Sequence, residues 1–189
     1  MPERTDIELF LEFKEQGNLR ALEALINRYK KAVLNFFWHL SGDEASSEDL
    51  AQEVFIRLAR SAGKYTPQAK FSTFLYRIVH NIWIDHGRIG VSKPRQVSLE
   101  VTIGRDCEDT LKDIIDSGAP KPIDELIDNE KEDILRNALK GVPEEQRLVV
   151  ELSLFGHLNY YEIAEVLEVP YGTVKSRLRL AIARLRELV

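Results

Sequence analysis

The stretch YYEIAEVLEVPYGTVKSRLRLAIARLRELV, residues 160–189, decides which fold is expected for this chain. Its apolar residues recur at helical spacing, are interrupted at Val169-Pro170, and then recur again. Proline ends one helix and is tolerated at the start of the next, where a missing N–H costs little. The pattern therefore predicts a helix-turn-helix. The residues expected to face the core are Ile163, Ala164, Leu167, Val174, Leu178, Ala181, Ile182 and Leu185.

The second of these helices turns a polar and basic surface away from its apolar face. Lys175, Ser176 and Arg179 lie on that outer side, with Leu180 beside them and Gly172 in the first turn. The N-terminus of a helix offers unpaired N–H groups to phosphate, and Lys or Arg one turn further along reaches phosphates or guanine edges. We interpret this side as a DNA-reading surface. The alternative is a C-terminal helix with a solvated basic face.

The composition describes an ordinary globular protein, because 44% of the 189 residues are apolar and 30% are charged. This length allows one large or two small domains. No apolar run approaches the roughly 20 residues of a membrane span, and the N-terminus is too acidic for a signal peptide. Cys107 is the only cysteine, which excludes a disulfide framework and agrees with a reducing compartment. We expect a cytoplasmic protein.

The net charge of −5 is distributed unevenly along the chain. Residues 171–189 hold five basic residues and one acidic residue, whereas residues 91–129 hold five basic and nine acidic residues. Phosphate neutralisation supplies most non-specific DNA binding, so a local basic patch on an acidic protein indicates modest DNA affinity. Such a protein would depend on a larger partner to hold it on DNA.

Helical periodicity predicts an all-α fold with two small domains. Residues 1–90 form the first domain, residues 127–189 form the second, and residues 91–126 form a flexible acidic linker in which periodicity fades. The helices expected in the first domain run over residues 5–16, 19–40, 46–61 and 71–88, the third capped by Ser46 or Ser47. The second domain begins near Ile127 with a helix that stops at Gly141, and helical periodicity restarts at Pro143.

Two outward faces of the first domain suggest binding surfaces. The helix over residues 46–61 turns Asp49, Gln52, Glu53 and Ile56 outward, which indicates either a solvated surface or a docking face for a basic partner helix.

The helix over residues 71–88 and the loop before it present basic, aromatic and amide side chains, a combination that suits unstacked bases. The residues expected on this outward side are Thr73, Arg77, His80, Asn81, Ile84 and Arg88, with Lys64, Tyr65 and Lys70 in the loop. His80 and His86 lie on different helix faces and no third ligand has suitable spacing, so no metal site is predicted.

With these segments placed, the chain resembles bacterial RNA polymerase sigma factors of the sigma-70 family, of the extracytoplasmic-function (ECF) type. Three motifs carry the resemblance, in the family's order. DLAQEVF at residues 49–55 resembles D-x-A-Q-E-x-F, and residues 71–85 resemble F-S-T-[WF]-L-Y-R-I-x-x-N-x-x-I-D. Residues 162–178 resemble E-I-A-x-x-L-x-V-P-x-G-T-V-K-S-R-L.

The resemblance implies that the protein binds core RNA polymerase and directs promoter recognition and transcription initiation. It implies that the protein contacts double-stranded DNA at the minus-35 element and single-stranded DNA at the minus-10 element. The loop over residues 64–70 would capture a flipped base. The implied polymerase contacts are Asp49, Gln52, Glu53 and Phe55. The implied minus-10 contacts are Lys64, Lys70, Thr73, Arg77 and Asn81. The implied minus-35 contacts are Tyr171, Gly172, Lys175, Ser176 and Arg179.

The family's members are typically held inactive by an anti-sigma protein, often anchored in the membrane, so such a partner at the inner membrane face is expected here. No cofactor, metal, small-molecule substrate or enzymatic activity is implied. Three positions depart from the family's pattern, namely Glu168 and, in place of a common Arg-Ala-Arg, Leu180 and Ile182, of which Ile182 is expected to face the core. Glu168 replaces a common Gly, so the turn either avoids a positive φ or holds Glu168 there at a cost of about 1 kcal/mol. Leu180 replaces an Arg and points toward DNA, where it contacts a thymine methyl or nothing.

Two other classes of protein compete with this interpretation. A stand-alone dimeric helix-turn-helix regulator would bind an operator tightly without polymerase, and it leaves the outward faces of the first domain unexplained. An enzyme, such as a helical hydrolase, would need a nucleophile and base, paired carboxylates or a phosphate-cradling Gly loop, and the sequence shows none of these patterns.

Overall fold

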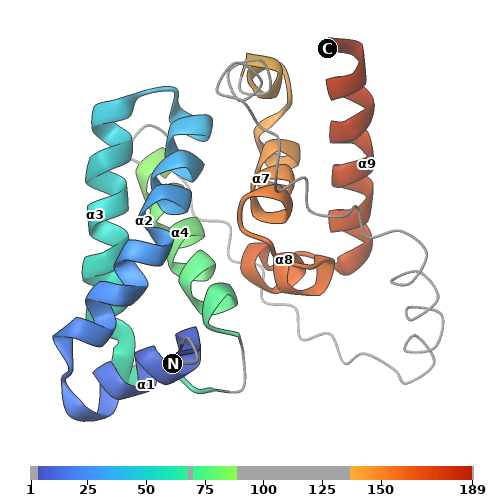
Figure 1. Cartoon of the computed structure of the whole chain (residues 1–189). Coiled ribbons are helices and arrows are strands. Elements are labelled where there is room, and N and C mark those ends of the chain that lie inside the picture. Colours follow the sequence, from blue (N-terminus) through green and yellow to red (C-terminus); the bar gives the residue numbers. More distant parts are fainter. Residues whose placement is uncertain (1–3, 68–69, 89–136, 189) are drawn as a thin grey trace, which may run out of the picture.

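The computed structural model describes residues 4–67, 70–88 and 137–188, and every regular element in these residues is a helix. The first group comprises α1 (Asp6–Gln16), α2 (Leu19–Ser41), α3 (Glu44–Ser61), the short 3-10 helix η1 (Ala62–Lys64) and α4 (Phe71–Arg88). The second group comprises α7 (Glu144–Leu154), α8 (Tyr160–Leu167) and α9 (Tyr171–Leu188), shown in orange to red in Figure 1. The predicted all-α fold is confirmed. The predicted linker and the predicted domain start near Ile127 lie outside the described residues.

Side-chain and glycine caps set the ends of the N-terminal helices. Thr5 and Glu8 form a capping box at the start of α1, and Gly17 ends this helix in the left-handed region with φ 67°. Gly42 ends α2 in the same way with φ 73°. The cap predicted for α3 is wrong: Asp43 accepts a hydrogen bond from the Ser46 backbone N–H at 3.0 Å, so the helix begins two residues earlier than expected.

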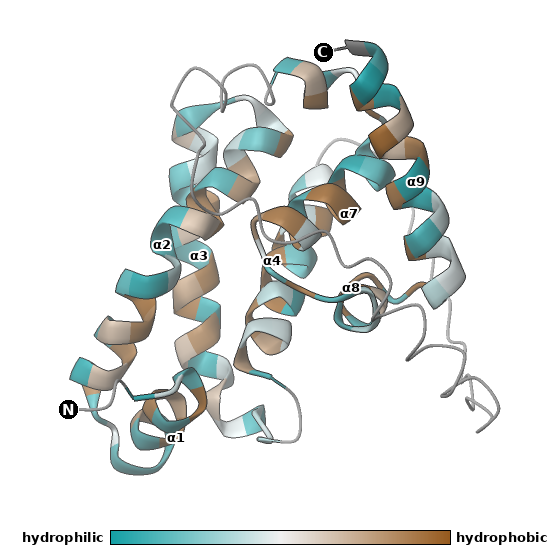
Figure 2. Ribbon diagram, turned by 45° about the vertical axis from the view of Figure 1, so that its right-hand side comes forward, coloured by the Kyte–Doolittle hydropathy of each residue, from teal (hydrophilic) through white to brown (hydrophobic). Residues whose placement is uncertain are grey.

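The first group packs around an aromatic core. Phe10 of α1 lies 5.1 Å from the ring of Tyr65, 5.0 Å from that of Phe71 and 5.9 Å from that of Phe74. The hydrophobic segments of α2, α3 and α4 turn toward one another, while hydrophilic segments face outward (Figure 2). Burial of such aromatic rings dominates the energetics of a small core.

Helix α7 is covered on both sides. Its residues Val149, Val150, Glu151 and Leu152 are all at most 1% exposed. Successive residues of a helix are 100° apart, so four buried neighbours leave no open face along this part of the helix. Helices α8 and α9 cover one side and α2 covers the other, while α8 also packs on α4 (Figure 1). The two helix groups therefore share an extensive contact surface.

The helix-turn-helix is confirmed, with one correction to its core. Asn159 and Glu162 form a capping box at the start of α8, and Glu168 ends it in the left-handed region with φ 53°. Of the two outcomes considered for Glu168, the chain adopts the positive φ. Ile182 was expected in the core but is 39% exposed, because the buried line of α9 runs through Val174, Leu178 and Ala181 and leaves Ile182 beyond its edge. Among the described helices, none combines the length and hydrophobicity of a membrane span.

Candidate nucleic-acid interface

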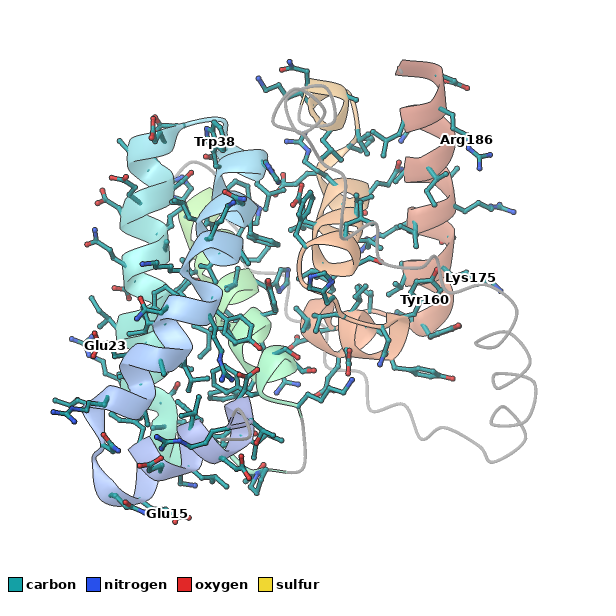
Figure 3. All side chains as sticks on the ribbon, viewed as in Figure 1. Glu15, Glu23, Trp38, Tyr160, Lys175 and Arg186 are labelled. Carbon is teal, nitrogen blue, oxygen red and sulfur yellow. The ribbon has the colours of Figure 1, made fainter. Side chains whose placement is uncertain are left out.

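The basic residues of α9 divide between two sides of the helix. Arg177 and Arg184 turn toward α7, where their guanidinium groups donate to Glu145 at 2.5 Å and to Gln146 at 2.6 Å. Lys175 and Arg179 are exposed, one helical turn apart. In Figure 3, Lys175 and Arg186 project from the side of α9 that faces away from the N-terminal helices. The helix thus presents an open cationic surface, as the sequence predicted for Lys175 and Arg179.

Tyrosine side chains surround the N-terminus of α9. The ring of Tyr171 lies 4.8 Å from that of Tyr161 and 6.1 Å from that of Tyr160. Burial raises the pKa of Tyr171 above its usual value, so its hydroxyl stays protonated and can donate to a phosphate. Gly172 is exposed beside it, and Ser176 donates from Oγ to the Thr173 carbonyl at 3.0 Å. The five predicted minus-35 residues therefore lie along the first three turns of α9.

A small cavity opens beside the loop that precedes α4. It has a volume of about 110 Å³ and is lined by Lys64, Tyr65, Thr66, Phe74, Arg77 and Glu165. Phe74 and the two cations on the wall suit a nucleobase with its phosphate. The outward position expected for Tyr65 is wrong, because its ring is 1% exposed and packs 5.1 Å from that of Phe74. The loop predicted to take a flipped base thus borders a concave site, although one wall carries an acidic residue from α8.

Two of the predicted minus-10 cations form ion pairs across the boundary between the helix groups. Arg77 donates to Glu165 at 2.6 Å, and Lys70 lies 2.8 Å from Glu162. Asn81 is exposed one turn further along α4 than Arg77. The sequence assigned no role to these two glutamates in relation to α4, because their partners lie about 90 residues away.

Thr73 does not lie on the outward face expected for it. It is 2% exposed, and its Oγ1 has no hydrogen-bond partner among the described residues. The expectation assumed a single buried face for α4, but the structure covers a second stripe of this helix with α8. The predicted outward position of Thr73 is therefore wrong in this arrangement of the two groups.

The acidic face of α3 lies open, as predicted. Asp49 and Gln52 are exposed, and Ile56 is 45% exposed beside them. Glu53 accepts a hydrogen bond from Arg57 at 2.7 Å, which leaves the glutamate partly neutralised. Phe55 is half-buried and packs against the core, so it supports this face more than it forms it.

The described residues also bear on the spacing that a metal ion needs. No group of three or more His, Cys, Asp or Glu side chains there could hold an ion. His80 is partly buried against α8, and this burial lowers its pKa, opposed by Glu168 and the backbone of Val166. His80 therefore belongs to the contact between the helix groups.

Two family models match the chain, one in each helix group. Sigma-70 region 2 matches residues 25–88, and the second model, "Sigma-70, region 4", matches residues 132–185. The ECF RNA polymerase sigma factor SigW of Bacillus subtilis is 30% identical over 92% of this chain and 91% of its own length. The RNA polymerase sigma-H factor of Pseudomonas aeruginosa is also 30% identical, over 95% of this chain and 89% of its own.

Solved structures show the same fold. CnrH in complex with the cytosolic domain of CnrY matches with a TM-score of 0.66 at 20% identity, over 97% of this chain and 96% of that one. The sigma factor RpoE of Bartonella quintana, in complex with the anti-sigma factor NepR, matches with a TM-score of 0.63 at 22% identity, over 88% and 94%. The family is not a class of enzymes, and the dimeric-regulator alternative is not favoured. The chain belongs to the ECF group of the sigma-70 family, whose members direct RNA polymerase to promoters and start transcription.

Proposed function

We propose that this ECF sigma factor reads its promoter with two separate surfaces and binds core polymerase with a third. The exposed cationic side of α9 carries the proposal for the minus-35 element, because Lys175 and Arg179 are open to solvent at the start of a recognition helix. Tyr171, Gly172 and Ser176 complete this surface. Residues 127–189 act as the unit that carries it.

The minus-10 surface is assigned to the loop cavity and the adjoining side of α4. A flipped base would enter the cavity beside Phe74, while Lys64, Lys70 and Arg77 hold the phosphates and Asn81 contacts a base edge. Thr73 can join these contacts only where α8 has moved away from α4. Residues 1–90 act as the unit that carries this surface.

The open face of α3 is assigned to polymerase. Asp49 and Gln52 are exposed there, and Glu53 and Ile56 extend the face by one turn. A carboxylate-rich face with one apolar residue suits a basic partner helix. Phe55 fixes the helix on its core. The protein acts by binding alone, in the cytoplasm, where the polymerase works.

An anti-sigma partner is part of the same proposal. Two relatives of this fold were solved in complexes, CnrH with CnrY and RpoE with NepR. A protein that covers the three surfaces would keep this sigma factor from polymerase and DNA. Co-purification of the tagged chain from its own cells, followed by identification of stoichiometric partners, tests this part.

Run-off transcription with core polymerase on a promoter library tests the function. We expect initiation that depends on this protein, and recovered promoters that share two sequence elements. Arg179→Ala and Arg77→Ala should each reduce initiation at least tenfold, because each removes a charged contact worth about 1.5–3 kcal/mol. Arg184→Ala and Arg20→Ala are the matched controls, since Arg184 faces α7 and Arg20 lies on α2. Undiminished initiation by both test variants would refute the site assignment.

A dimeric regulator is separated from a sigma factor by size-exclusion chromatography. The sigma factor should elute alone as a monomer and shift into the polymerase peak when core enzyme is added. A dimer that stays out of that peak would contradict the polymerase-binding role.

A further inference from the structure

The surface between the two helix groups is built from specific polar contacts. Tyr76 donates from its hydroxyl to the Phe155 carbonyl at 3.4 Å, and Trp83 donates from Nε1 to Glu144 at 2.7 Å. Arg147 of α7 reaches the carbonyl oxygens at the C-terminal end of α2, at 3.5 Å and 3.3 Å. These contacts join α4 to the α7 and α8 region and α2 to α7. The relative position of the two groups is therefore defined by side chains.

The same surface covers the proposed minus-10 site. Arg77 and Lys70 are paired with Glu165 and Glu162 of the helix-turn-helix, and Glu165 forms one wall of the cavity. A carboxylate offers Arg and Lys the same anionic oxygen acceptors that a DNA phosphate offers. A cation that is paired with a carboxylate binds a phosphate more weakly, so these carboxylates and the DNA backbone compete for the same two residues.

Burial of Thr73 also blocks the minus-10 site, in this case by steric exclusion of the DNA strand. Thr73, Tyr76, Arg77 and His80 form one stripe of α4 at i, i+3, i+4 and i+7 spacing, and contacts of the last three place this stripe against α8 and the loop before it. At 2% exposure the Thr73 hydroxyl is beyond the reach of a strand while the groups are packed together.

A buried, hydrogen-bonded couple joins α2 to α7. His39 Nδ1 and Glu151 Oε2 are 3.0 Å apart, and the two side chains are 2% and 0% exposed. The ring of Phe155 lies 4.9 Å from that of His39. Since each residue belongs to a different helix group, separation of the groups would expose both partners to water.

The hydrogen bonding of this surface is incomplete. Four side-chain atoms among the described residues are buried without a hydrogen-bond partner: Thr73 Oγ1, Arg77 Nε, Arg147 Nε and Glu151 Oε1. All four residues belong to the contact between the helix groups. Buried polar atoms in a permanent core are nearly always paired, so unpaired atoms confined to one contact surface indicate an interface built to separate.

We propose that the packing of α8 on α4 is an autoinhibitory closed state, in which Glu162 and Glu165 occupy the place of promoter phosphates and the His39–Glu151 couple holds the groups together. The proposal rests on the minus-10 surface assigned above. In it, the free protein is a weak binder of the minus-10 strand because only its open fraction has Lys70, Thr73 and Arg77 available. Engagement of a partner that favours the open form releases the site.

Glu165→Gln tests the phosphate replacement directly. This variant keeps the size of the side chain and removes only the charge that pairs with Arg77. We expect a fluorescein-labelled single strand carrying the non-template minus-10 sequence of a recovered promoter to bind the free full-length variant about three- to tenfold more tightly than the wild type. Small-angle X-ray scattering should show a larger radius of gyration.

Glu145→Gln is the matched control. It changes the net charge by the same amount on the same helix group, but Glu145 pairs within that group, with Arg177 of α9. An equal gain in strand affinity for Glu145→Gln and Glu165→Gln would show that net charge alone is responsible, and it would overturn the proposal.

The role of the His39–Glu151 couple in closure is tested with a second pair of variants. His39→Leu leaves Glu151 buried without its partner, whereas His39→Gln retains a side-chain donor at this position. We expect His39→Leu to expand the protein and tighten strand binding, and His39→Gln to remain closer to the wild type. Retained helical circular dichroism confirms that each variant is folded. If His39→Leu stays as compact as the wild type, the proposed role of the His39–Glu151 couple in closure is refuted.

Failure of this inference is distinguishable from failure of the proposed function. If the wild type initiates at its promoters but neither Glu165→Gln nor His39→Leu changes compactness or strand affinity, autoinhibition is wrong and the sigma-factor sites stand. If Arg77→Ala leaves initiation intact, the minus-10 assignment fails, and the scattering data still report on closure.

Discussion

Glu168 holds a backbone conformation that L-residues rarely adopt, with φ 53° at the C-terminal cap of α8. A side chain in the left-handed region costs about 1 kcal/mol relative to glycine, which lacks the clashing Cβ. The turn tolerates this cost because α8 and α9 need an abrupt change of direction between Leu167 and Tyr171. Its position beside His80 also places Glu168 at the contact with α4.

Replacing Glu168 with glycine should therefore stabilise the C-terminal helices. We expect Glu168→Gly to raise the free energy of unfolding by about 0.5–1 kcal/mol, measured by urea denaturation. Glu168→Ala is the control, because it removes the carboxylate but keeps the Cβ. An equal gain for both variants would assign the effect to charge and contradict the backbone explanation.

Thr73 carries a hydroxyl that is buried without a partner in the closed arrangement. Thr73→Val removes this group at nearly constant volume, so the free energy of unfolding should stay unchanged or rise by about 1 kcal/mol. Run-off initiation should fall, because valine lacks the hydroxyl proposed to contact the minus-10 strand. Thr73→Ser keeps the hydroxyl and should retain initiation. A Val variant with full activity would remove Thr73 from the site.

At the scale of single elements, α9 separates its cations by function. Lys175 and Arg179 are open, whereas Arg177 and Arg184 donate hydrogen bonds at the surface to Glu145 and Gln146 of α7. In the proposed function the same helix reads DNA with one side, while its other side is secured to α7. Ile182 is exposed beside the buried stripe of α9, although its helical spacing predicts it in the core.

This division predicts different salt dependences. Each phosphate contact that is lost should lower the slope of log affinity against log salt by about 0.9 for duplex DNA. Lys175→Gln and Arg179→Gln should each show this change with duplex minus-35 DNA in fluorescence anisotropy. Arg184→Gln should leave the slope unaltered. A reduced slope for Arg184→Gln would show that the inner side of α9 also meets DNA.

Helix α4 carries a histidine whose protonation opposes closure. Burial of His80 against α8 lowers its pKa from the ordinary value of 6.5, so the packed arrangement favours the neutral ring. Its contribution to closure is present above pH 6.5 and is lost as the pH falls below that value. Glu151 acts in the opposite direction, since burial raises its pKa and acidification favours its buried form.

Comparison with His80→Gln isolates the histidine effect. As the pH falls from about 7.5 to 5.5, the radius of gyration of the wild type should increase relative to that of His80→Gln, which cannot titrate at this position. Small-angle X-ray scattering in constant ionic strength measures this difference. Identical pH profiles for the two proteins would contradict the role of His80.

At the scale of the whole molecule, two kinds of electrostatic contact hold the groups together. The Arg77–Glu165 pair is open to solvent, with side chains 42% and 47% exposed, whereas the His39–Glu151 couple is buried. Salt screens exposed pairs strongly and buried pairs weakly. In the proposed closed state the exposed pairs therefore cover the residues assigned to the minus-10 strand, and the buried couple sets how firmly the groups close.

Raising the salt concentration from about 0.05 M to 0.5 M should expand the free protein, because the Debye length falls well below 10 Å and the exposed pairs weaken. The radius of gyration reports this expansion. Glu165→Gln lacks one exposed pair, so its radius should respond less to salt. An equal response in both proteins would show that the exposed pairs do not contribute to closure.

Local patterns in the sequence were sufficient for most elements and for several site residues. Helix periodicity located α1, α2, α4 and the helix-turn-helix, because it depends on residues three and four apart. The motifs on α3 and α9 located side chains that are open in the structure, such as Gln52 and Lys175. The cap of α3 was missed because Asp43 stands before the serines that also suit a cap. Which of these open residues contact polymerase and DNA stays a prediction.

By itself the sequence determined the helical class, the helix-turn-helix and membership of the sigma-70 family, since each depends on short-range order along the chain. Only the tertiary structure decided which faces meet between the two helix groups. Arg77 and Glu165 are 88 residues apart, and neither periodicity nor motif relates such positions. Thr73 was expected in the open for that reason, and it is buried because a second layer of helices packs on a face that looks polar in the sequence.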